Sequence, residues 1–208
     1  MSWKLALGVG VALVLMTAIG RVVEDPETGT ATWDASRAAG FAGYSLAWLS
    51  VMGGMLLHLR VRVRGLALTW FLEAHRMLSA LALAFVAAHI AGLLMDPVVH
   101  FGPVHVVVPF TSEYRPWQTG LGTAAAWLMI AVLTTTALAG RMSYSRWRAW
   151  HLLAFPAWAL ALVHGLAAGT DSGATAAVTV YAATAAAVAA LGAVRVAGRG
   201  WVSAGEAM

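Results

Sequence analysis

Four histidines lie inside apolar segments that are long enough to cross a membrane: His75, His89, His151 and His164. Ionisable side chains at bilayer depth are costly, and they are rarely kept there without a partner or a cofactor to face. The first two are 14 residues apart and the last two are 13 residues apart. At a rise of 1.5 Å per residue, each pair spans about 20 Å along its helix. If both segments run in the same direction, the four side chains form two levels, with one histidine from each segment at each level.

Two imidazoles at one depth on neighbouring parallel helices can ligate one iron from both faces. A haem held in this way has no open position for a substrate, which suits electron transfer. The sequence therefore predicts two stacked haems, one between His75 and His151 and the other between His89 and His164. Each histidine could instead bond a carbonyl group of a neighbouring helix. A zinc site is disfavoured, because none of the four has another histidine four residues away.

The helical phase supports one half of this arrangement. At 100° per residue, His75 and His89 lie about 40° apart around their helix, whereas His151 and His164 lie about 140° apart on an ideal helix. Pro156 stands between the second two and removes a backbone donor, so we expect a kink there that re-aims the second half of the segment.

The composition is that of an integral membrane protein, because 61% of the residues are hydrophobic and only 11% are charged. About 20 apolar residues are needed to span a bilayer as a helix. The expected fold is an all-α, six-helix transmembrane bundle. Its helices are expected at residues 3–19, 38–59, 66–95, 119–139, 147–168 and 174–194.

Loop charges predict that both termini are cytoplasmic, because cytoplasmic loops carry the excess of Lys and Arg. With this orientation three arginines fall on the outer side, namely Arg21, Arg37 and Arg115. The other loop and terminal cations fall inside: Lys4, Arg60, Arg62, Arg64, Arg141, Arg146, Arg148, Arg195 and Arg199. The first segment could alternatively be a cleaved signal peptide, which would leave five helices in the same orientation.

Two arginines flank the inner histidine level. Arg76 follows His75 directly, and Arg148 is three residues before His151. Each could bind the propionates of an inner haem by charge-assisted hydrogen bonds. Equally, both could be interfacial anchors with no cofactor to bind.

Two stretches of the chain resemble the ferric reductase-like transmembrane domain superfamily. They run from Glu73-Ala-His75-Arg76 to Ala88-His89-Ile-Ala-Gly, and from Trp147-Arg-Ala-Trp150-His151 to Leu162-Val-His164-Gly165. This superfamily includes the membrane cores of ferric reductases and NADPH oxidases, and the haem subunit of bacterial methionine sulfoxide reductase systems. The resemblance covers residues 66–168, within a single haem-binding domain of residues 1–208. It implies two haem b groups, with the four histidines as axial ligands.

The expected function is that of a b-type cytochrome that carries electrons outward across a bacterial plasma membrane. There is no cysteine for a thiolate metal site or an iron–sulfur cluster, and no glycine-rich dinucleotide fingerprint follows an expected strand. Electrons are therefore expected from a separate cytoplasmic reductase or from membrane quinol. The expected acceptor is an external metal ion or an extracytoplasmic redox protein, such as a methionine sulfoxide reductase, and no nucleic acid is expected as a partner.

The outer loop of residues 96–117 carries His100, His105 and Glu113, which could dock a ferric or cupric ion. Other classes of function remain open at this point. The chain could be a non-catalytic haem-binding component, or a proton-coupled transporter that uses the buried histidines as a relay and binds no haem.

Overall fold

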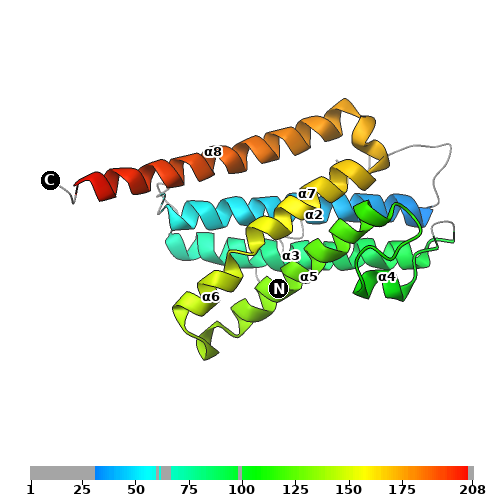
Figure 1. Ribbon diagram of the computed structural model, residues 1–208, viewed down its shortest axis with the longest axis horizontal. Coiled ribbons are helices and arrows are strands. Elements are labelled where there is room, and N and C mark those ends of the chain that lie inside the picture. Colours follow the sequence, from blue (N-terminus) through cyan, green and yellow to red (C-terminus); the bar gives the residue numbers. More distant parts are fainter. Residues whose placement is uncertain (1–30, 60, 62–66, 98–99, 206–208) are drawn as a thin grey trace.

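The computed structural model describes residues 31–59, 61, 67–97 and 100–205, and every element in this part of the chain is helical (Figure 1). The segment expected at residues 3–19 lies outside the described residues, as does Arg60. The elements are α2 (Ala31–His58), α3 (Leu68–Met95), α4 (Pro103–Val107), α5 (Pro116–Ala137), η1 (Ala139–Arg141), α6 (Tyr144–His151), α7 (Ala154–Ala168), η2 (Thr170–Gly173) and α8 (Thr175–Gly205).

Five stretches within the described residues are long and apolar enough to cross a membrane. The expectation of an all-α, multi-pass membrane protein is therefore confirmed. The five stretches are Ala31–His58, Leu68–Met95, Pro116–Ala137, Tyr144–Ala168 and Thr175–Ala197. A sixth helix and the cytoplasmic placement of both termini stay predictions.

Helices α2 and α3 lie side by side and antiparallel along the length of the molecule (Figure 1). Small residues let their backbones approach closely, as is common where membrane helices pack. A side chain at Gly43 would meet Val86 of α3 at 3.2 Å, and one at Gly92 would meet Ser36 of α2 at 2.7 Å. This close seam places α2 directly behind the histidines of α3.

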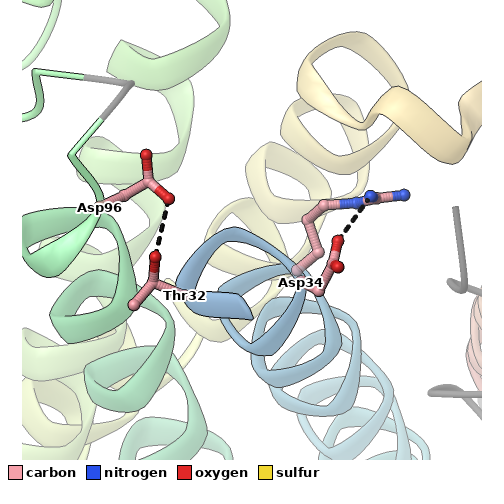
Figure 2. Close-up of polar contacts among 4 residues, drawn as sticks. Thr32, Asp34 and Asp96 are labelled. Carbon is pink, nitrogen blue, oxygen red and sulfur yellow. Dashed lines mark hydrogen bonds and ion pairs between the residues drawn. The ribbon is translucent and has the colours of Figure 1, made fainter. Parts of the chain in front are cut away.

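Helix α2 begins at Ala31, seven residues before the expected start at residue 38. The added turns are polar, and Asp34 in the first turn complements the helix dipole. The Thr32 hydroxyl donates to the Asp96 carboxylate at 2.9 Å, and Arg37 pairs with Asp34 at 3.3 Å (Figure 2). Because Asp96 caps the end of α3, the first of these bonds ties the start of α2 to the end of α3.

The segment expected to form one helix over residues 147–168 is two helices, α6 and α7, separated by a turn at Leu152 and Leu153. The amide of Phe155 bonds to the carbonyl of Leu152, three residues back, at 3.2 Å. Pro156 has no amide hydrogen to bond the same carbonyl, so the α-helical hydrogen bond that would end at Leu152 is missing where the turn separates α6 from α7.

Helix α8 packs against α2 and α7 through an aromatic cluster of Tyr44, Trp158 and Tyr181. Helix α4 belongs to the loop between α3 and α5 and is held on α5. The Thr123 hydroxyl donates to the carbonyl of His105 at 3.0 Å, and the Trp127 indole donates to that of Val107 at 3.1 Å. The loop is therefore packed at the end of the bundle that holds Asp96.

Candidate functional site

The four histidines form two pairs of nearly identical geometry. The ring centroids of His75 and His151 are 6.1 Å apart with an interplanar angle of 69°. Those of His89 and His164 are 6.2 Å apart at 70°. The structure therefore brings together the same pairs that were matched by depth in the sequence.

This separation is the one that an intervening metal requires. A metal–imidazole bond is about 2.0–2.1 Å long and the ring centre lies about 1.1 Å beyond the nitrogen, so two imidazoles on opposite sides of one metal have centroids about 6.3 Å apart. Rings in direct contact can have the same separation: Trp147 and His151 stack with centroids 4.9 Å apart, whereas Trp33 and Tyr114 meet edge to face at 6.0 Å. Both pairs thus fit a single iron between their rings.

Three of the four rings have their Nδ1 atom directed at a main-chain carbonyl of the neighbouring helix. His75 donates to Ser50 at 2.8 Å and His89 donates to Ser36 at 2.8 Å, both on α2. His164 donates to Gln118 of α5 at 2.7 Å. Because a carbonyl only accepts, the proton of each ring is on Nδ1, which leaves the Nε2 lone pair for a metal.

The fourth ring differs in its partner. Nδ1 of His151 lies 3.3 Å from the hydroxyl of Thr136 on α5, and Trp147 stacks on this ring at an interplanar angle of 23°. An outer partner for the second ring nitrogen is what metal-ligating histidines have, because it sets the tautomer and the ring orientation. All four histidines are held in this way.

Glycines provide the space for three of the rings. A methyl group at Gly40 would lie 2.8 Å from Nδ1 of His89, and one at Gly122 would lie 2.8 Å from Nδ1 of His164. At Gly54 it would lie 3.3 Å from Cε1 of His75. Each glycine is four residues after the residue whose carbonyl accepts the Nδ1 proton. Because glycine has no side chain, the histidine ring can approach the helix closely enough to bond the carbonyl four residues earlier.

These residues on α2 and α5 were missed in the sequence analysis, although a signal was available. Ser36-x3-Gly40 and Ser50-x3-Gly54 are separated by 14 residues, the same interval as His75 and His89. Because α2 and α3 pack antiparallel and the two intervals are equal, the Ser36 motif lies opposite His89 and the Ser50 motif lies opposite His75. Gln118-x3-Gly122 repeats the pattern on α5.

The turn at Leu152 and Leu153 explains how His151 and His164 can both face α3. An unbroken helix would direct His151 and His164 about 140° apart, but both rings face histidines of α3 in the structure. The break between α6 and α7 falls directly after His151, so the two ligands are carried by different helices with different axes.

A cavity of about 390 Å³ lies beside the His89–His164 pair, within the size range of cofactor sites. Its lining is mostly apolar and aromatic, and it includes Phe41 and Trp158. Trp158 is buried. The donor set and the apolar enclosure fit a haem, which buries a large aromatic ring system.

The two arginines predicted as propionate ligands lie beside the His75–His151 pair. The side chain of Arg76 is exposed and that of Arg148 is partly buried. In the loop between α3 and α5, the described residues hold no group of three or more His, Asp or Glu side chains close enough to share an ion. His105 contacts the Thr111 hydroxyl at 3.2 Å, and metal docking in this loop stays a prediction.

Comparison of this chain with protein-family models, with curated proteins and with solved structures finds no match in any of the three.

Proposed function

We propose that this protein is a transmembrane b-type cytochrome that carries electrons across the membrane through two bis-histidine haems. The observation that carries the proposal is the repeated geometry of the two pairs, with ring centroids 6.1 and 6.2 Å apart. What supports the proposal is that the same separation and the same interplanar angle occur twice, at two levels of the bundle, in rings whose Nδ1 atoms all have partners.

The residues have distinct roles in this function. The ring nitrogens of His75, His151, His89 and His164 would hold the two haem irons, and the carbonyls of Ser50, Ser36 and Gln118 orient the rings of His75, His89 and His164. When bound, haem supplies one-electron exchange between ferric and ferrous iron. With two histidines at each level, a haem held there would have no position for substrate, which favours electron transfer over oxygen chemistry.

The direction of transfer and the partners follow from the resemblance and the loop charges. The His75–His151 pair would lie at the cytoplasmic level, served by a separate reductase or by membrane quinol. The His89–His164 pair would lie at the outer level, next to an external metal ion or an extracytoplasmic redox protein. Arg76 and Arg148 would bind propionates at the cytoplasmic level.

A reduced-minus-oxidised absorption spectrum of the purified protein tests the proposal, with haem counted per chain as the pyridine haemochrome. We expect sharp low-spin b-type bands and two haems per chain. No haem, even after haem is supplied during expression, would contradict the proposal and favour a histidine proton relay.

Single substitutions then assign each haem to its level. His89→Ala and His164→Ala should each leave one haem per chain with the spectrum of the His75–His151 site. His105→Ala, in the loop between α3 and α5, is the matched control and should leave two. Retention of both haems in His89→Ala would show that the pairing is wrong.

A further inference from the structure

The loop between α3 and α5 has a composition that is unusual for a loop in water. From residue 97 to residue 112 it contains no Asp, Glu, Lys or Arg. Four of its apolar side chains are exposed, by 45% to 59% each: Val104, Val107, Val108 and Phe110. A cluster of exposed apolar side chains marks a surface that an apolar phase or another molecule covers.

Two hydrogen bonds place this segment beside the middle of α5. The Thr123 hydroxyl donates to the carbonyl of His105 at 3.0 Å, and the Trp127 indole donates to that of Val107 at 3.1 Å. The two donors are 7 and 11 residues after Pro116, where the 22-residue α5 begins, which is about 10 and 16 Å along a helix. Because α5 is long and apolar enough to cross a membrane, the segment reaches back to membrane depth.

Main-chain groups of the segment are bonded within the protein. Besides the two bonds from α5, the Thr111 hydroxyl donates to the carbonyl of Val108 at 2.8 Å. The amide of Val108 donates to the carbonyl of Val104, also at 2.8 Å. In hydrocarbon no water can bond a carbonyl, so irregular backbone there needs protein partners. Internal bonding of the main chain with valines exposed is the reverse of what a loop in water shows.

The end of the segment is fixed by Phe110, whose φ of 66° is unfavourable for a bulky residue. Its ring covers Gly120 of α5, where any side chain would overlap it. The ring also contacts Trp117, at a centroid separation of 5.1 Å. Trp117 is 73% exposed, and charged residues return beside it at Glu113 and Arg115. Exposed tryptophan next to charge is typical of the membrane–water interface.

We propose that residues 103–110 form a re-entrant segment whose valine side chains contact lipid acyl chains. The lipid is the occupant because the exposed surface is continuous with that of a membrane-spanning helix. Trp127, which bonds the segment, and Ile130, one turn further on, are both exposed on α5. The apolar surface therefore runs from the segment onto α5 without a charged residue between them.

This placement gives the segment a second contact. Phe101, Val106 and Val107 line the cavity beside His89 and His164. A single layer of chain would thus separate that cavity from the bilayer. The inference goes beyond the proposed function and does not depend on what fills the cavity.

The test uses single cysteines, because the chain has none of its own. Val107→Cys is compared in lipid nanodiscs with Ile130→Cys on α5 and with Glu113→Cys, which lies in the same loop outside the segment. The thiolate is the reactive form, and hydrocarbon disfavours it. We therefore expect a membrane-impermeant maleimide to label Val107→Cys and Ile130→Cys at least about tenfold more slowly than Glu113→Cys. All three should label equally in detergent denaturant.

A fluorophore on the same cysteines identifies the lipid. Nitroxide groups carried on the acyl chains should quench it at Val107→Cys and Ile130→Cys alike, and only weakly at Glu113→Cys. Val104→Cys tests the same exposed surface from a second position, in case Val107→Cys disturbs the fold.

Two results would overturn the inference. Labelling of Val104→Cys and Val107→Cys as fast as that of Glu113→Cys would show that the segment faces water. Protection from the maleimide without quenching by the nitroxide lipid would show that protein covers it. That protein is a second copy of the chain if oxidation links Val107→Cys into a dimer, and a different partner if it does not. Haem content is measured separately, so failure of either proposal can be told from failure of the other.

Discussion

At the residue scale, each imidazole is fixed by its Nδ1 partner, and the two rings of each pair are turned 69° or 70° relative to one another. The ring plane of an axial imidazole determines which iron d orbital it overlaps. When the two ring planes are nearly perpendicular, each ring overlaps a different one of two iron d orbitals, so these two orbitals have nearly the same energy. The ligand geometry therefore has a spectroscopic consequence that is separate from haem content.

We predict that both ferric haems give highly anisotropic low-spin signals in electron paramagnetic resonance, and that neither reduced haem binds carbon monoxide. The first follows from the perpendicular rings and the second from two nitrogen ligands on each iron. Spectra at liquid-helium temperature would show this in wild type, with His89→Ala as the control that removes one signal. A rhombic, three-line spectrum would indicate parallel rings and contradict the geometry.

The glycines that face the rings give a graded prediction. Gly40→Ala and Gly122→Ala place a methyl group 2.8 Å from a ring nitrogen, whereas Gly54→Ala places it 3.3 Å from His75. Overpacking of this kind costs about 1–3 kcal/mol, so we expect haem loss at the His89–His164 site in the first two variants and a smaller loss at the other site in Gly54→Ala.

Gly53→Ala is the matched control for the glycine series, because its methyl group would meet His75 only at an ordinary 3.9 Å. Haem content per chain and haem retention on dilution in detergent give the readout. If Gly40→Ala retained haem as well as Gly53→Ala, close approach to the ring would not be limiting.

At the element scale, the interruption between α6 and α7 decides where His151 points. Insertion of one alanine between Leu153 and Ala154 would rotate α6 by about 100° relative to α7. Helix α7 is held by α8 and α2 through Trp158, so we expect the short α6 to move and the His75–His151 haem to be lost. Haem content after insertion would be compared with an insertion after Gly173, which has open space around it and should retain both haems.

The bond between Thr32 and Asp96 joins α2 to α3 at one end of the seam (Figure 2). Thr32→Val removes it and should lower the free energy of unfolding by about 0.5–1.5 kcal/mol, seen as a lower melting temperature in detergent. Thr179→Val is the control, because that exposed hydroxyl bonds only the carbonyl of Thr175 in its own helix. Equal melting temperatures would show that the bond between α2 and α3 adds nothing to stability.

At the scale of the whole molecule, the two histidine levels are separated by about 20 Å along α3, so neither site alone spans the bilayer. In vesicles that enclose ferricyanide, we expect an impermeant external reductant to reduce the trapped ferricyanide when wild type is present. His89→Ala and His75→Ala should each abolish this reduction. Transfer that persisted in either variant would exclude a route through both levels.

The sequence by itself determined the membrane character, the helical fold and the four histidines with their spacing. These properties are local, because apolar length and residue intervals can be read along one segment. The expected helix limits agree with the structure where the chain is apolar, as at Met95. They differ where polar residues continue a helix, as at Ala31. The break at Leu152 was expected near Pro156 for a local reason, the missing amide hydrogen.

Only the tertiary structure decided what surrounds each imidazole. The bonds to the carbonyls of Ser36 and Gln118 and the space over Gly40 depend on which helix faces which, and at what rotation. No residue interval within one helix encodes these contacts, because each is made between segments far apart in the chain. The pairing of the four histidines could therefore be predicted from the sequence, whereas the groups that orient their rings are determined by the packing of α2 and α5 against the histidine helices.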